Sequence, residues 1–133
     1  MSILLPFLIT TLVFIAIDLI WLGIIAKPLY QHFMGHLLRP SPHWPVAILF
    51  YFLFILGMLI FSIFPAISQK SVTHALLMGG LYGFFTYMTY DLTNWAVLKN
   101  WPGKIVIIDI LWGSVLSLSV SGMSTWIYLR LIN

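Results

Sequence analysis

Residues 3–26 read ILLPFLITTLVFIAIDLIWLGIIA, an apolar run whose single charged side chain is Asp18. A helix needs about 20 mainly apolar residues to cross the hydrocarbon core of a bilayer, and this run is long enough. It has no basic leader and no small-residue cleavage site before Lys27. We therefore expect a retained membrane helix here and not a signal peptide.

Three similar apolar runs follow along the chain, separated by short polar segments that each contain Lys or Arg. The sequence therefore predicts an all-α integral membrane four-helix bundle that forms a single domain over residues 1–133. The expected helices cover about 3–26, 46–67, 72–98 and 105–131. Pro28 suits the first position of a helix, so residues 28–38 are expected to form a short helix in the membrane interface. The second run is polar only at Tyr51 and Ser62, and we expect it to face lipid or a neighbouring subunit.

The composition excludes several classes of protein. Of the 133 residues, 62% are hydrophobic and 7% are charged, whereas soluble domains have roughly 45–50% and 25%. Mean hydropathy is +1.07. So few charges exclude a soluble globular domain, a disordered chain and a nucleic-acid partner, and they leave membrane lipid as the expected surroundings. The absence of cysteine excludes disulfides, thiolate metal sites and cysteine nucleophiles.

Basic residues in short loops predict the orientation in the membrane, because they are enriched on the cytoplasmic side. The loops after the first and third runs carry four of them, at Lys27, Arg39, Lys99 and Lys104. The opposite side carries Lys70 and Arg130. We therefore expect loops 27–45 and 99–104 to be cytoplasmic and both termini to lie outside.

All three acidic residues of the chain, Asp18, Asp91 and Asp109, lie inside predicted membrane helices. Their separations from the basic loops place them on one side of the membrane, roughly 8–13 Å from the interface. A charged side chain in the hydrocarbon costs roughly 2.5–3.5 kcal/mol, so we expect the three to face the bundle interior together. No Lys or Arg lies at that depth. The cluster must therefore be protonated or hold a cation.

Polar and aromatic side chains repeat around the aspartates at helical spacing. Tyr87 and Asn94 share a helix face with Asp91, while Trp21 and Trp112 each follow an aspartate by three residues. An indole N–H can donate to a carboxylate, and an indole face attracts cations. The predicted binding residues are Asp18, Trp21, Tyr87, Asp91, Asn94, Asp109 and Trp112.

Several short strings resemble a known family: DLIWLG from Asp18, Lys27 with Tyr30, Phe50-Tyr51, YDLTN from Tyr90, and DILWG from Asp109. The family is a group of predicted bacterial membrane proteins, domain of unknown function 2177. The resemblance covers nearly the whole chain, and the YDLTN string is its most specific part. It implies a four-helix protein of the bacterial inner membrane and supplies no activity.

Carboxylates without a basic partner favour binding or transport of a proton, a metal ion or a small cationic solute. Asp18, Asp91 and Asp109 would be the ligands of a metal, and their oxygens suit a hard divalent cation such as Mg²⁺, Ca²⁺ or Mn²⁺. Four helices enclose little space, so we expect a homodimer if the protein is a transporter.

Two alternatives stay open. In the first, the chain is a membrane-embedded enzyme or accessory subunit in lipid or fatty-acid modification, with the aspartates doing acid–base work. In the second, it is a structural or assembly protein whose aspartates join the helices. The sequence assigns no catalytic residue and does not decide whether the protein is an enzyme.

Overall fold

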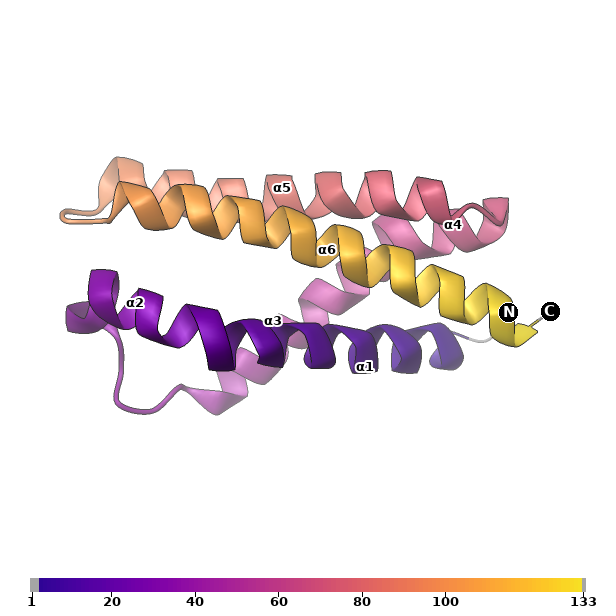
Figure 1. The fold of residues 1–133 in the computed structure, drawn as a ribbon, viewed down its shortest axis with the longest axis horizontal. Helices are drawn as coiled ribbons and strands as arrows, with labels where there is room; N and C mark the ends of the chain where they lie inside the picture. Colours follow the sequence, from indigo (N-terminus) through magenta and orange to yellow (C-terminus); the bar gives the residue numbers. More distant parts are fainter. Residues whose placement is uncertain (1–2, 133) are drawn as a thin grey trace.

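The computed structural model describes residues 3–132, which form helices joined by short loops, with no strand in that part of the chain. The α-helices are α1 (Leu4–Ile20), α2 (Lys27–Met34), α3 (Trp44–Met58), α4 (Phe64–Gln69), α5 (Val72–Val97) and α6 (Gly103–Ile132). Because α1 continues into α2 and α3 into α4, they make four long helical rods (Figure 1). The predicted all-α helical bundle is confirmed.

The first rod does not end at Lys27 as the sequence suggested. A π-helical segment, Trp21–Ala26, joins α1 to α2, and helical structure extends to Leu37. The ring of Pro28 would clash with the carbonyl four residues earlier in a regular α-helix. In the wider turns the Lys27 N–H bonds to the Leu22 carbonyl, five residues back, which gives the proline ring room. Residues 27–34 are therefore helical, as expected, but continue the line of α1.

The second rod repeats this arrangement. Its π-helical segment, Leu59–Ile63, ends two residues before Pro65, and the Phe64 N–H bonds to the Leu59 carbonyl. The rod then ends at Lys70, whose left-handed backbone turns the chain toward α5. Ser71 caps α5 by accepting the N–H of His74 at 3.0 Å.

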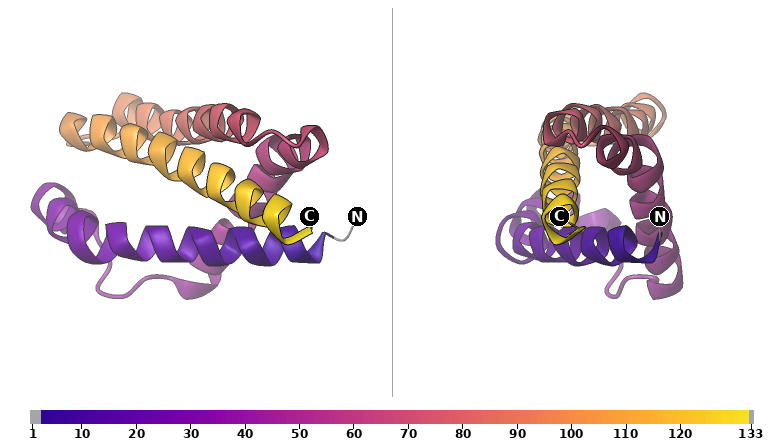
Figure 2. Two further views of the ribbon diagram at one scale, coloured as in Figure 1. Left: turned by 45° about the vertical axis from the view of Figure 1, so that its right-hand side comes forward. Right: turned by 90° about the vertical axis from the view of Figure 1, so that its right-hand side faces the viewer.

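Helices α5 and α6 run antiparallel and side by side, as both views of the ribbon show (Figure 2). Glycine makes this close approach feasible. A Cβ on Gly79 would overlap the Ser121 side chain, and one on Gly83 would overlap the Gly113 carbonyl and the Ser117 side chain. Gly79 and Gly83, four residues apart on α5, therefore allow the two helices to approach closely, as small residues do between membrane helices.

Helix α1 lies close to α6 near the chain ends and separates from it toward α2 (Figures 1 and 2). We call the two parts of the bundle the narrow half, near the termini, and the wide half, near α2 and the α5–α6 loop. The end of α3 packs in the core, where Met58, Leu59 and Ile63 are buried. The second helix was expected to face lipid or a neighbouring subunit. The exposed beginning of α3 agrees with this expectation, and the buried end of the rod does not.

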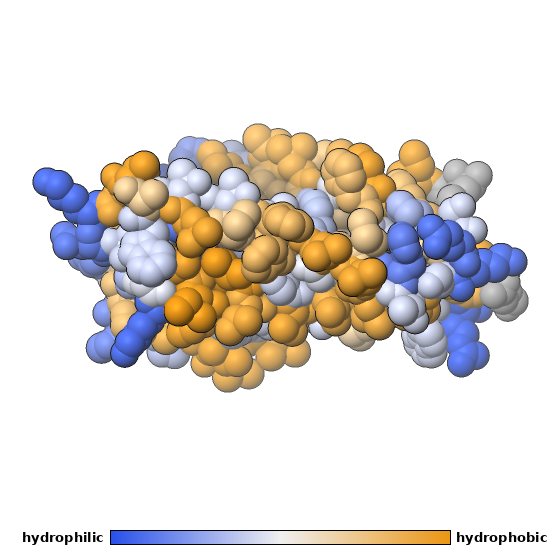
Figure 3. Space-filling model, turned by 90° about the horizontal axis from the view of Figure 1, so that it is seen from above, coloured by the Kyte–Doolittle hydropathy of each residue, from blue (hydrophilic) through white to orange (hydrophobic). Residues whose placement is uncertain are grey.

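Three helical stretches of the described chain are long and apolar enough to cross a membrane: Leu4–Leu37, Trp44–Gln69 and Gly103–Ile132. Helix α5, with 26 residues, has the length but carries several Thr and Tyr residues besides Asp91 and Asn94. Its crossing stays a prediction. On one face of the molecule, apolar side chains cover the middle and hydrophilic ones gather at both ends, as expected for a protein in a bilayer (Figure 3).

Candidate functional site

The three aspartates line one cavity of about 270 Å³ in the wide half of the bundle. We call it the aspartate cavity. Every rod contributes to its wall, and so does the loop between α5 and α6. The lining residues are Asp18, Trp21, Leu22, Tyr30, Met34, Leu38, Phe50, Tyr51, Tyr87, Tyr90, Asp91, Trp101, Ile105, Asp109 and Trp112.

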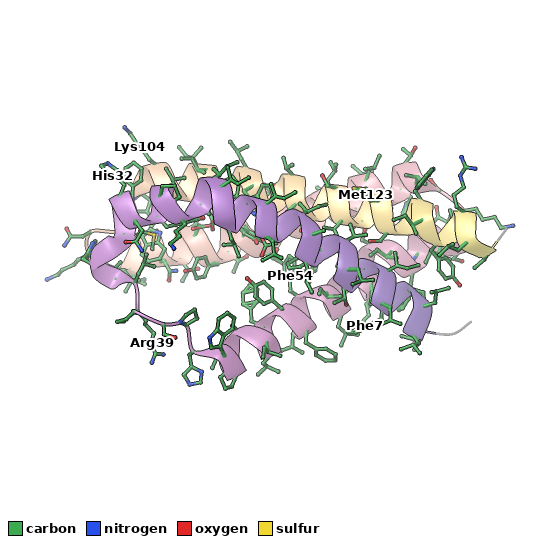
Figure 4. The ribbon with its side chains drawn as sticks, turned by 60° about the horizontal axis from the view of Figure 1, so that its bottom comes forward. Phe7, His32, Arg39, Phe54, Lys104 and Met123 are labelled. Carbon is green, nitrogen blue, oxygen red and sulfur yellow. The ribbon has the colours of Figure 1, made fainter. Side chains whose placement is uncertain are left out.

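Basic side chains lie around the wide half without lining the cavity. His32 and Lys104 lie at the outer end of the wide half, and Arg39 lies on the loop that leads to α3 (Figure 4). None of the lining residues is Lys, Arg or His. The aspartates are therefore at the basic end of the molecule, as their sequence spacing predicted, and the cavity wall itself has no positive side chain.

Asp18 lies on the last turn of α1, just before the wide turns. It is 9% exposed, and its carboxylate accepts a hydrogen bond from the Tyr51 hydroxyl of α3 at 3.3 Å. The indole of Trp112 interacts with the same carboxylate from α6. Asp18 therefore joins three rods at the wall of the cavity.

Asp109 and Asp91 face the cavity from the hairpin formed by α6 and α5. The Tyr30 hydroxyl of α2 donates a short hydrogen bond to Asp109. Asp91 is completely buried, and neither of its oxygens has a hydrogen-bond partner within residues 3–132. Its nearest charged neighbour is the Asp109 carboxyl. These two can share a hydrogen bond only if one of them carries a proton.

Aromatic rings form much of the remaining wall. Trp21 of the first rod stacks on Trp112 of α6, with ring centroids 4.3 Å apart and planes inclined by 7°. The Tyr87 ring lies against Gly113, where an added Cβ would overlap it. Tyr90 packs edge-on against Trp101 at 6.0 Å. The indole N–H of Trp101 is buried without a partner among the residues described.

The structure brings together six of the seven residues that the sequence suggested for binding. Asn94 is the exception: it lies nearly one turn beyond Asp91 on α5, outside the cavity wall. Five aromatic residues that were not among the predicted binding residues also line the cavity: Tyr30, Phe50, Tyr51, Tyr90 and Trp101. A signal existed for Tyr51, since it is one of only two polar residues in a long apolar run.

The arrangement does not favour a metal centre. Within residues 3–132, no group of three His, Cys, Asp or Glu side chains is placed to hold a metal ion. Asp18 interacts with Tyr51 and Trp112, while Asp91 and Asp109 form a separate pair. The three carboxylates share a cavity, and no single ion would contact all of them.

A family model described as "Predicted membrane protein (DUF2177)" matches residues 3–126. The chain belongs to this family. The match confirms the resemblance noted in the sequence, and it carries no activity with it. No curated protein and no solved structure matches the chain.

Proposed function

We propose that this membrane protein binds a small organic cation in the aspartate cavity, with protons competing for the same carboxylates. One observation carries the proposal. Asp91 is completely buried, lines the cavity beside the Asp109 carboxyl, and accepts no hydrogen bond from any other group of the described chain. A bare carboxylate in that position is strongly disfavoured unless a proton or another cation neutralises it.

The charge of the wall supports this proposal. Two further carboxyls, Asp18 and Asp109, line the same cavity, and no basic side chain lines it. Three like charges in a medium of low dielectric repel one another strongly. An entering cation would relieve that repulsion, while an anion would add to it.

The aromatic wall favours an organic ammonium group over a metal ion. Three Trp and four Tyr side chains line the cavity. Ring faces attract cations, and aromatic cages are a common way to recognise quaternary ammonium groups. A hard divalent ion instead needs six or more oxygen ligands around one point, and the aspartates are not grouped in that way.

Proton exchange follows from the same groups. If one proton is shared by Asp91 and Asp109, an arriving ammonium group displaces that proton. When the ammonium group leaves, the carboxyls take up a proton again. Such exchange is the minimal chemistry of a proton-coupled transporter, and we extend the proposal to transport on this basis. Three predictions from the sequence stay predictions: that the wide half is cytoplasmic, that the membrane is the bacterial inner membrane, and that the protein is a homodimer.

The direct test is calorimetric titration of the protein in lipid nanodiscs with tetramethylammonium, a compact cation without a tail. We expect binding that weakens about tenfold or more in Asp91→Asn, because the neutral amide no longer balances the positive charge. Ser114→Ala serves as a control, since Ser114 bonds to its own helix at Ile110 and lies outside the cavity wall.

Three outcomes are informative. Asp91-dependent binding that weakens as the pH falls supports the proposal, because protons then compete with the cation. Equal affinity in the unchanged protein and in Asp91→Asn contradicts it. So does the absence of any heat of binding in folded protein, checked by its circular dichroism spectrum.

Lipid modification is the second candidate, because the hydrogen-bonded pair Tyr30–Asp109 lies beside Asp91 and could move a proton. Adjacent hydroxyl and carboxyl groups suit acid–base work on a lipid headgroup. Comparison of lipid profiles between a deletion strain and a strain carrying Asp91→Asn tests this candidate. Identical profiles in the deletion and parent strains would remove its support.

A further inference from the structure

Two apolar grooves, one on each side of α3, share wall residues with the aspartate cavity. The α1–α3 groove, of about 580 Å³, is lined by residues such as Phe7, Phe14 and Ile48 and shares Asp18, Leu22 and Tyr51 with the cavity. The α3–α5 groove, of about 720 Å³, is lined by Leu53, Phe54 and Thr86 and shares Tyr87, Tyr90 and Asp109 with it. Each groove therefore has an acidic side chain in the part of its wall that it shares with the cavity, Asp18 in one and Asp109 in the other.

The α1–α3 groove has the length of a lipid chain. It follows α1 from Phe7 past Asp18 to Leu22, and the part between Phe7 and Asp18 is roughly 16 Å long at 1.5 Å per residue. Because Asp18 lies roughly 8–13 Å inside the interface of the wide half, this part of the groove runs from that depth across the middle of the hydrocarbon core toward the narrow half. The outer faces of both helices are apolar and exposed, at Leu12 and Leu49 for example. The groove therefore opens toward the acyl chains of the bilayer.

We infer that the ligand of the aspartate cavity is a cationic amphiphile, with its ammonium group among the aspartates and its hydrocarbon chain in the α1–α3 groove. This inference rests on the proposed function and names the class of compound that the site binds. The ligand reaches the cavity sideways from the membrane, between α1 and α3, and its ammonium group takes the place of the Tyr51 hydroxyl at Asp18.

Charge complementarity separates this ligand from ordinary phospholipids. A phosphate group in the cavity would lie against three carboxyls without any Lys, Arg or His in the wall to balance it. The like charges would repel at short range. The headgroup that fits is therefore an amine or quaternary ammonium without phosphate, and the Trp and Tyr side chains of the wall are the residue types that bind such groups.

Titrations in nanodiscs can compare tetramethylammonium with dodecyltrimethylammonium at matched mole fractions in the bilayer. Empty nanodiscs give the partition of the tail into lipid. The test variant is Ala47→Phe, because Ala47 lines the groove and an added ring would fill it. Ala96→Phe is the matched control, since Ala96 is exposed on α5 and lines none of the three spaces.

We expect the ratio of dodecyl to tetramethyl affinity to fall about tenfold in Ala47→Phe and to stay unchanged in Ala96→Phe. If Ala47→Phe does not fold, the smaller change Ala47→Leu is measured in its place. An unchanged ratio in the folded variants would overturn the inference. Displacement by dodecylphosphocholine as strong as by dodecyltrimethylammonium would also overturn it, because a zwitterionic phosphate headgroup would then fit.

Failure of this inference differs from failure of the proposed function. If tetramethylammonium binds in an Asp91-dependent way and the tail adds nothing, only the amphiphile is wrong. If tetramethylammonium binding does not depend on Asp91, the proposed function itself is wrong.

Discussion

Among the described residues, both halves of the bundle bury polar side chains without a partner, but only the wide half leaves space beside them. In the narrow half, Ser117 and Ser121 are completely buried, and their hydroxyls have no partner in the described chain. Asp91, in the wide half, shares both properties. The difference is space: the serines are pressed against Gly79 and Gly83, whereas Asp91 faces a cavity of about 270 Å³.

This contrast shows that a buried polar group marks a site only where something else can enter. A serine hydroxyl is small and costs little to bury, so it can take part in close helix packing. A carboxyl group is far more costly to bury without a partner. Its position beside empty volume is therefore the stronger indication of a ligand. Mutations that act on one half and spare the other test this distinction.

The largest effect is expected from Gly79→Ala in the narrow half. The new methyl group would lie 2.6 Å from the Ser117 carbonyl, which is backbone and cannot rotate away. We expect a loss of about 2–3 kcal/mol in the free energy of unfolding, measured by detergent denaturation followed by circular dichroism. Gly23→Ala is the matched control, since nothing lies within 4 Å of its Cβ position. A loss of equal size in both variants would contradict this account of the narrow half.

A smaller effect is expected from removal of the hydroxyls that bind carboxylates in the wide half. Tyr30→Phe removes the hydrogen bond to Asp109 and should lower the free energy of unfolding by about 1–1.5 kcal/mol, as for an ordinary hydrogen bond to a carboxyl group. Tyr51→Phe removes the longer bond of 3.3 Å to Asp18 and should lower it by about 0.5 kcal/mol. The same denaturation experiment measures both. If Tyr51→Phe were the more damaging change, the assignment of bond strengths would be wrong.

The smallest effect is expected from Ser121→Ala. Its hydroxyl is buried without a partner, so its removal breaks no hydrogen bond, and alanine still fits beside Gly79. We expect the free energy of unfolding to change by less than about 0.5 kcal/mol. A loss well above 1 kcal/mol would mean that this hydroxyl is bonded and that the narrow half holds a polar network.

Depth along the helix axis could be predicted from the sequence. The distances of Asp18, Asp91 and Asp109 from the basic loops placed them at one level, and all three line the same cavity. The spacing of three residues that linked tryptophans to aspartates also identified Trp21 and Trp112, which stack on each other. These inferences hold because the rise per residue of a helix is fixed.

Contacts between rods could not be predicted in the same way. The hydrogen bonds of Tyr30 and Tyr51 depend on how neighbouring rods are rotated, which no spacing within one helix reveals. Asn94 shares the stripe of Asp91 but lies too far along α5 to reach the cavity. Pro28 suggested the start of a separate short helix, and the π-helical turns that join it to α1 give little sign in the sequence.

The π-helical turns also determine the direction in which the side chains of α2 point, relative to those of α1. Asp18 and Tyr30 are twelve residues apart, which in an unbroken α-helix would point them roughly 120° away from each other. A π-helical turn holds more residues than an α-helical turn, so each residue rotates the chain about the helix axis by a smaller angle. The segment Trp21–Ala26 thus resets α2 relative to α1 so that both side chains face the same space. Deleting one residue from that segment would rotate Tyr30 off Asp109 without altering any residue of the cavity wall on the other rods.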